Sequence, residues 1–144
     1  MSGLRRPECE MRAVLPATLE AVEGFSAEFR LRNRSLTTRA QAFSAELLLR
    51  EALANALVHG CREDPSRRIR CVWRLGNARL TIAVEDDGEG FDWRALTDRR
   101  SDDGKTSGRG MEILRTYSTR VRFNARGNSV TILKRFRREE PEYA

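Results

Sequence analysis

The spacing of apolar residues along the chain predicts three helices. Apolar side chains recur three and four residues apart over about residues 18–33, and Thr18 is a suitable N-cap for that helix. A second helix, over about residues 38–59, is apolar around most of its circumference, as expected for a helix that packs on a sheet. A shorter helix is predicted over about residues 109–117.

Alternating apolar and polar residues predict five strands. Gly76-Asn77 and Gly127-Asn128 are turn signals, and each separates two of these strands to form a hairpin. The order strand, helix, helix, hairpin, helix, hairpin predicts the α+β class. We expect a two-layer α/β sandwich with a mixed, mostly antiparallel sheet and helices on one face. The predicted strands cover residues 10–15, 69–75, 80–84, 121–123 and 130–136.

Length and composition favour one domain in a reducing compartment. The chain has 144 residues, of which 40% are hydrophobic, so we expect a single domain over residues 1–144 with its core at about residues 10–136. Three cysteines (Cys9, Cys61 and Cys71) form no Cys-x-x-Cys pair and suit a reducing environment. No apolar run has the length of a membrane span, and the first ten residues lack the apolar centre of a signal peptide. A cytoplasmic protein is therefore expected.

The formal net charge of +6 raises the question of nucleic acid. The arginines are scattered among 21 acidic residues, without interleaved aromatic residues or a recognition-helix pattern, so nucleic acid is not the expected partner. An arginine-rich solvated surface, with or without a patch for an acidic protein, explains the charge.

A row of polar residues interrupts the apolar second helix. Glu51, Asn55 and His59 lie four residues apart, which places them on one helix face, and Gly60 follows as a candidate C-cap. An amide oxygen from Asn55 suits a hard divalent cation that holds nucleotide phosphates, and Glu51 is then available as a base. The alternative is a solvated edge of the helix, and a histidine near a helix C-terminus is favourable to the dipole in any case.

A second group of polar residues follows the strand at residues 80–84. If the apolar residues of that strand face the helices, Asp86 lies on the same face at its end and looks toward the helix that carries Glu51. Asp86 can accept a hydrogen bond from an exocyclic amine such as that of adenine, while Gly88 and Gly90 permit close approach. The alternatives are a tight turn or a calcium loop, and the two glycines occupy positions where a calcium loop needs acidic ligands.

The third group opens the helix at residues 109–117. Ser107-Gly108-Arg109-Gly110 places free backbone N–H groups at a helix N-terminus, where an anion such as phosphate binds. A Walker A loop is excluded because Arg99 stands where it needs a glycine, and the third glycine of a dinucleotide fingerprint is missing. A covalent nucleophile is not indicated either, since the cysteines lack a basic partner in sequence.

Taken together, the three groups resemble the N, G1 and G2 boxes of the GHKL ATPase superfamily, over about residues 10–136. The resemblance implies the Bergerat ATPase fold, with ATP and Mg²⁺ as cofactors. Asn55 would bind Mg²⁺, Glu51 would be the general base, and Asp86 would bind the adenine amine in a pocket shaped by Gly88 and Gly90. A lid would span about residues 98–107. The remaining residues expected to contact the nucleotide are His59, Lys105, Thr106, Ser107, Gly108, Arg109, Gly110 and Met111, with Lys105 or Arg109 as candidates for a positive charge near the γ-phosphate.

Within that superfamily, the chain resembles the anti-sigma-factor serine/threonine kinases of bacterial partner-switching systems. The resemblance rests on the Glu51-Ala52-x-x-Asn55-Ala56-x-x-His59-Gly60 form and on the short chain. It implies a protein kinase that phosphorylates a small anti-sigma-factor antagonist and sequesters a sigma factor or another regulatory protein, with a possible homodimer. The alternatives are a nucleotide-binding module that holds a partner without phosphoryl transfer, and a detached histidine-kinase-like catalytic domain.

Overall fold

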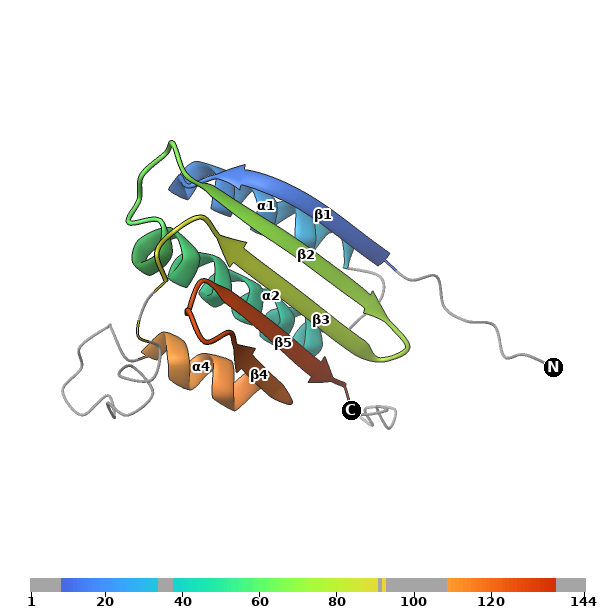
Figure 1. Cartoon of the computed structure of the whole chain (residues 1–144). Helices are drawn as coiled ribbons and strands as arrows, with labels where there is room; N and C mark the ends of the chain where they lie inside the picture. Colours follow the sequence, from blue (N-terminus) through green and yellow to red (C-terminus); the bar gives the residue numbers. More distant parts are fainter. Residues whose placement is uncertain (1–8, 34–37, 91, 93–108, 137–144) are drawn as a thin grey trace, which may run out of the picture.

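One antiparallel sheet of five strands forms the front layer of the molecule (Figure 1). The computed structural model describes residues 9–33, 38–90, 92 and 109–136. Neighbouring strands in the sheet follow the order β1-β2-β3-β5-β4, and all four pairings are antiparallel. The strands are β1 (Cys9–Pro16), β2 (Arg68–Gly76), β3 (Arg79–Asp86), β4 (Arg120–Phe123) and β5 (Ser129–Arg135).

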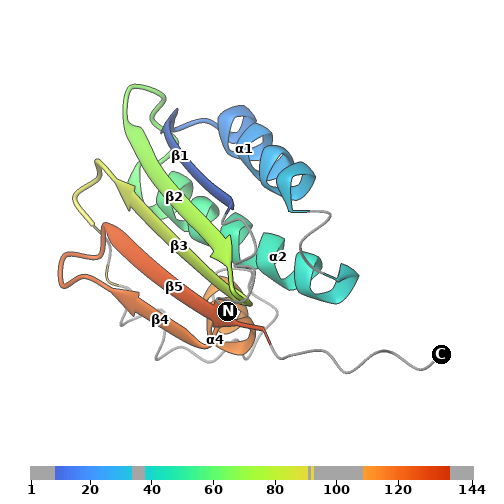
Figure 2. The same ribbon diagram turned by 90° about the vertical axis from the view of Figure 1, so that its right-hand side faces the viewer.

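In the described part of the chain, three α-helices cover one face of this sheet (Figure 2): α1 (Leu19–Arg32), α2 (Arg39–Asn55) and α4 (Arg109–Tyr117). The first helix has the predicted N-cap, because Thr18 Oγ1 accepts from the Ala21 N–H at 3.2 Å. The second helix begins with a capping box between Thr38 and Gln41, which the sequence analysis did not predict. The predicted two-layer α+β architecture with helices on one side is therefore confirmed, and the described sheet is antiparallel throughout.

The core lies between the two layers and follows from strand alternation. On β3, Leu80, Ile82 and Val84 are buried against the helices, whereas Arg79 and Ala83 are exposed on the other face. The largest buried side chain, Trp73 of β2, packs edge-on against Phe29 of α1 at 4.8 Å between ring centroids. Asp86 continues the buried side of β3, as its position in the alternation predicted.

Two local predictions were wrong. The second helix does not continue as an α-helix to His59, because a π-helix, η1 (Ala56–Gly60), follows α2, and the Cys61 N–H donates to the carbonyl five residues earlier at 2.7 Å. Gly60 is not a left-handed C-cap either, since the left-handed residues after this helix are Arg62 and Glu63.

The turn between β2 and β3 is displaced by one residue from the predicted Gly76-Asn77. Gly76 still pairs with Arg79 in the ladder, and Asn77 and Ala78 form the turn with φ angles of 52° and 57°. Two successive positive φ angles are typical of the type I′ hairpin, whose twist matches that of the strands. Over the part of the chain that the structure describes, no helix has the length and apolar character to cross a membrane.

Candidate functional site

The N-terminal end of α4 lies directly against the polar face of α2. A Cβ atom added to Gly110 would lie 2.8 Å from Glu51 Oε2 and 3.6 Å from Asn55 Oδ1. A side chain at position 110 would therefore have to displace the Glu51 carboxylate from its present place. The sequence groups around Glu51 and Gly110, almost sixty residues apart, therefore meet at one place.

Glu51 is half-buried at this contact. Burial raises the pKa of its carboxyl above the ordinary range, and the neighbouring Arg50 guanidinium opposes that shift. A carboxylate with a raised pKa holds a proton more readily than one in water, which suits a group that has to accept a proton from a substrate.

Asn55 carries a buried polar atom without a partner. Its Nδ2 is inaccessible to solvent and makes no hydrogen bond to any of the described residues. Buried amide groups are normally paired, so an orphaned amide on this face indicates that a ligand completes its bonding. The two side-chain atoms of an asparagine can exchange places by a flip, so the amide can also present its oxygen to a cation.

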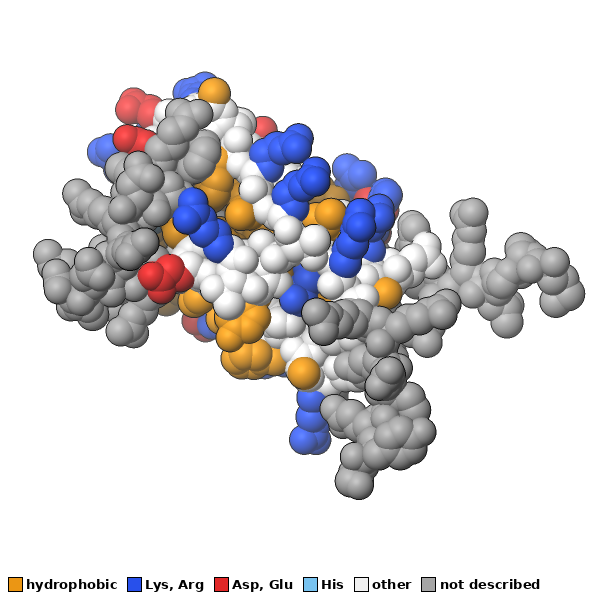
Figure 3. Space-filling view, turned by 90° about the horizontal axis from the view of Figure 1, so that it is seen from below, with side chains coloured by type: hydrophobic (Ala, Val, Ile, Leu, Met, Phe, Trp, Pro, Cys, Tyr) orange, Lys and Arg blue, Asp and Glu red, His pale blue; other side chains and the backbone are white. Residues whose placement is uncertain are grey.

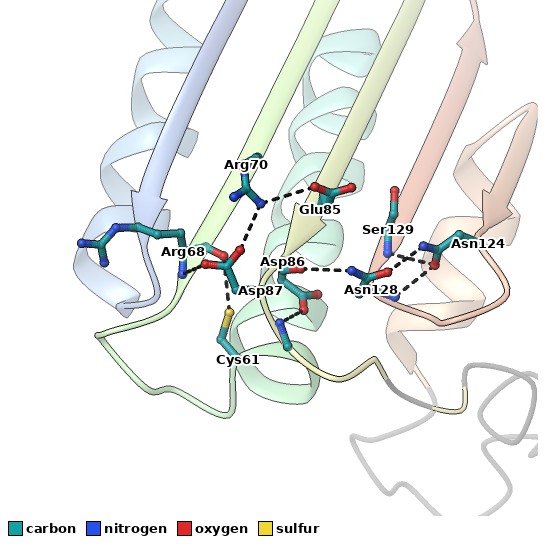
Figure 4. Close-up of polar contacts among 10 residues, drawn as sticks. Cys61, Arg68, Arg70, Glu85, Asp86, Asp87, Asn124, Asn128 and Ser129 are labelled. Atoms are coloured by element: carbon teal, nitrogen blue, oxygen red, sulfur yellow. Dashed lines mark hydrogen bonds and ion pairs between the residues drawn. The ribbon is translucent and has the colours of Figure 1, made fainter.

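Asp86 lies at the end of β3, only 4% exposed. Its Oδ1 accepts a hydrogen bond from the Gly88 N–H at 2.7 Å (Figure 4). Burial raises the pKa of this carboxyl, and the Gly88 hydrogen bond opposes the shift. Among the described residues its side chain has no cationic partner at ion-pair distance, so the acceptor capacity left on the buried carboxylate is available to a ligand donor.

Two glycines make room for this carboxylate. A Cβ on Gly60 would lie 2.2 Å from Asp86 Oδ2, and a Cβ on Gly88 would lie 2.0 Å from the Gly60 carbonyl oxygen. The end of η1 and the loop after β3 are thus in direct contact, and glycine is required at Gly60 by close packing rather than by a left-handed conformation.

Asn128 holds the backbone of Asp86 from the other side. The Asp86 N–H donates to the Asn128 carbonyl at 2.9 Å, and Asn128 Nδ2 donates back to the Asp86 carbonyl at 3.3 Å. Asn124 Nδ2 in turn donates to Asn128 Oδ1 at 2.6 Å (Figure 4). Sequence reasoning used Asn128 only as a turn residue and missed this contact, for which the only available signal was an amide in the turn beside the expected end of β3.

The neighbouring acid, Asp87, has a different environment. Its carboxylate accepts from Arg70 Nη1 at 3.0 Å and from the Arg68 backbone N–H at 3.1 Å, on the β2 side of the strand (Figure 4). Asp87 therefore ties β3 to β2, whereas Asp86 faces the helices. The distinction follows from the alternation of side chains along the strand.

A pocket connects the two parts of the site. Its walls come from α2, η1, β3, β4, β5 and the β4–β5 turn, and it joins the Asn55 amide to the Asp86 carboxylate across an apolar floor. The lining combines apolar walls with a few convergent polar groups, as the lining of a ligand site does. The lining residues are Ala52, Asn55, Ala56, Val84, Asp86, Phe123, Gly127, Asn128, Ser129 and Val130.

The other predicted site residues lie in several places. Gly90 has a φ of 89° and approaches the Arg126 carbonyl, where a Cβ would lie 1.8 Å away. His59 is half-buried in the last turn of η1. The Met111 side chain is 5% exposed and belongs to the hydrophobic core, so any contact with a nucleotide has to come from its backbone. Lys105, Thr106, Ser107, Gly108, the lid at about 98–107 and the side chain of Arg109 lie outside the described residues.

Comparison with known families gives a match over most of the chain. Residues 13–134 match the family described as the histidine kinase-like ATPase domain, which is most of the chain. The chain belongs to this family. Membership implies ATP binding, usually with Mg²⁺, and phosphotransfer or ATPase chemistry, and it confirms the superfamily resemblance seen in the sequence.

A solved structure is also similar to this ATPase domain. It is the histidine kinase domain of the blue-light activated histidine kinase from Erythrobacter litoralis EL346, with 19% sequence identity and a TM-score of 0.47. The similarity covers 82% of the present chain and 59% of that chain, so the ATPase domain spans under two thirds of the solved chain. A search of the curated proteins gives no match.

Proposed function

We propose that this ATPase domain is a serine/threonine protein kinase of a bacterial partner-switching system. The observation that carries the proposal is the approach of Gly110 to Glu51 and Asn55, which places a half-buried carboxylate beside the start of a helix whose N-terminus suits phosphate. Phosphoryl transfer depends mostly on positioning and charge neutralisation, and both can be supplied at such a place.

The residues fit ATP and Mg²⁺. Asn55 would hold the cation through its amide oxygen, which is consistent with a buried amide that lacks a partner among the described residues. Asp86 would accept a hydrogen bond from the adenine amine, and the apolar pocket walls would cover the base. When bound, ATP supplies the phosphoryl group and Mg²⁺ neutralises charge on its phosphates.

Glu51 would act on the protein substrate. Its carboxylate would accept the proton of a seryl or threonyl hydroxyl, while ATP would supply the γ-phosphoryl group to the hydroxyl oxygen and leave as ADP. Burial, which raises its pKa, makes it a stronger base than a solvated glutamate. A domain that only holds nucleotide needs Asn55 and Asp86 but has no use for a base at this position, so Glu51 favours a kinase over a pure binding module.

The partners proposed here rest on the sequence resemblance. The substrate would be a small anti-sigma-factor antagonist, and the sequestered partner a sigma factor or another regulatory protein. A homodimer is proposed on the same basis.

Transfer of label from radiolabelled ATP to candidate substrates, the small proteins encoded nearby, tests the proposal. Glu51→Gln should retain ATP affinity and lose transfer by a factor of about 100 to 10,000, as expected for loss of a general base. Glu20→Gln, at an exposed position in the first turn of α1, is the matched control and should transfer like the wild type. Transfer by Glu51→Gln at the wild-type rate would contradict the role of Glu51. ATP binding without transfer by the wild type would favour a binding module, and acid-labile label would favour a histidine kinase.

A further inference from the structure

The outer face of the sheet, opposite the helices, is divided by charge. Three arginines on the β1–β2 side are neutralised: Arg12 and Arg74 pair with Glu10 at 3.1 and 3.4 Å, and Arg70 pairs with Glu85 and Asp87 at 3.3 and 3.0 Å. Arg68, at the start of β2, is exposed and has no ion pair among the described residues. These ion pairs balance the charge locally. The paired arginines can therefore serve as control positions for the arginines on the other side of the same face.

The β3–β5–β4 side carries four further arginines, Arg79, Arg120, Arg122 and Arg135, which we call the arginine cluster. All four are exposed, and none of their guanidinium groups has an ion pair or a hydrogen bond among the described residues. The other outward positions of β5 are Ser129, Thr131 and Leu133, so this strand offers no acid. In Figure 3, blue side chains gather over the upper part of the view, with smaller red areas beside some of them.

The strand register places the like charges of the arginine cluster close together, which destabilises the sheet. Arg79 and Arg135 are directly opposite each other in the β3–β5 ladder, and like charges at opposed positions destabilise a sheet. Arg120 and Arg122 are two residues apart on β4, opposite Leu133 and Thr131, so they point to the same face about 6.5 to 7 Å apart. Proteins carry such local conflicts at functional sites, and a ligand of opposite charge would compensate this one.

We infer that the arginine cluster binds an acidic, extended segment of a protein partner. Carboxylates on alternate residues of such a segment match the spacing of Arg120 and Arg122, and the Leu133 side chain between the strands offers apolar contact. Nucleic acid fits less well, because the outward positions of the described strands carry no aromatic residue on which bases could stack. Glu10, Glu85 and Asp87 on the rest of the face would also repel a long polyanion.

The cluster is separate from the nucleotide site. Arg79 begins β3 and Asp86 ends it, so the two lie about 23 Å apart along the strand, and the cluster faces away from the helices. Partner binding here does not depend on phosphoryl transfer, so a failure of the kinase proposal leaves this inference standing.

Fluorescence anisotropy with a labelled peptide of alternating glutamate and threonine tests the inference. A peptide in which glutamine replaces glutamate is the uncharged control. Exposed ion pairs each strengthen binding by a factor of about 1.4 to 5, so Arg120→Thr/Arg122→Thr should weaken binding about two- to thirtyfold. Arg79→Thr/Arg135→Thr should do the same. The control Arg12→Thr/Arg74→Thr removes the same charge from the neutralised side and should change affinity less than twofold.

Thermal unfolding checks that each variant is folded, and threonine suits these exposed strand positions. The inference is overturned if the wild type does not bind the glutamate peptide, or if the control double variant loses as much affinity as the cluster variants. It is also overturned in favour of nucleic acid if duplex or single-stranded DNA binds more tightly than the peptide and loses affinity in the cluster variants.

Discussion

Replacing Gly60 by alanine should weaken ATP binding indirectly, by displacing the Asp86 carboxylate. The new Cβ would lie 2.2 Å from Asp86 Oδ2 and 2.3 Å from its Cγ, so the carboxylate has to move by more than about 1 Å to reach ordinary contact distance. Asp86 is 4% exposed and is held by the Gly88 N–H at 2.7 Å, so it has little free space to move into. Loss of one hydrogen bond to a charged acceptor costs about 1.5 to 3 kcal/mol, which corresponds to roughly ten- to 150-fold weaker ATP binding.

The assay is titration with a fluorescent ATP analogue, accompanied by urea unfolding. Gly60→Ala should also lower the free energy of unfolding by about 1 to 3 kcal/mol, because an extra methyl group is forced into a packed site. Gly24→Ala is the control, since a Cβ on Gly24 in α1 meets nothing within 4 Å. That variant should bind ATP like the wild type and gain up to about 1 kcal/mol of stability from helix propensity. Unchanged ATP affinity and stability in Gly60→Ala would refute the packing argument.

Three further predictions concern single residues. The pKa of the Asp86 carboxyl is raised in the folded state above its ordinary value of 3.8, so the folded protein binds this proton more tightly than the unfolded chain. The free energy of unfolding should therefore fall as the pH rises from about 4 through the raised pKa. Urea unfolding of Asp86→Asn should lack this part of the decrease, and a pH profile identical to that of the wild type would contradict the assignment. Gly110→Ala should displace the Glu51 carboxylate and lower the transfer rate by roughly 100-fold, with a smaller change in ATP affinity. If single-turnover assays show that transfer rate and ATP affinity fall equally, the effect is not one of positioning. Arg135→Thr should raise the free energy of unfolding by about 0.2 to 1 kcal/mol because it removes a like charge opposite Arg79, and a decrease in urea unfolding would show that the pair is not repulsive.

The architecture could be predicted because local patterns decide it. Helix spacing, the N-cap Thr18 and strand alternation predicted the order of elements, and the alternation on β3 placed Asp86 on the buried face. These signals depend on residues near one another in the sequence, so no tertiary contact was needed to recognise them.

The predictions that were wrong depend on contacts between distant segments. The apolar spacing along the second helix does not distinguish a π-helical end from a continuing α-helix. The last residue of the π-helix is packed on Asp86, almost thirty residues further along the chain. The hairpin turn required a choice between Gly76-Asn77 and Asn77-Ala78, and the strand register, which places Gly76 opposite Arg79, decided it.

Some contacts of the candidate site could not be predicted from the sequence. The sequence predicted Gly110 at the phosphate site and Gly60 as a helix cap, but it did not predict that they pack against Glu51 and Asp86, because these contacts join segments distant in the chain. The arginine cluster is similar, because Arg79 and Arg135 become neighbours only through the β3–β5 register.

We propose that Asn55 anchors Mg²⁺ and ATP beside the Glu51 carboxylate. The most direct test is calorimetric titration of ATP, with and without Mg²⁺, into the wild type and Asn55→Ala. The matched control is Asn128→Ala, which removes an amide that contacts the backbone of Asp86. The account predicts that the wild type binds ATP more tightly with Mg²⁺, that Asn55→Ala loses this gain, and that Asn128→Ala keeps it. An undiminished effect of Mg²⁺ on ATP affinity in Asn55→Ala would contradict the account.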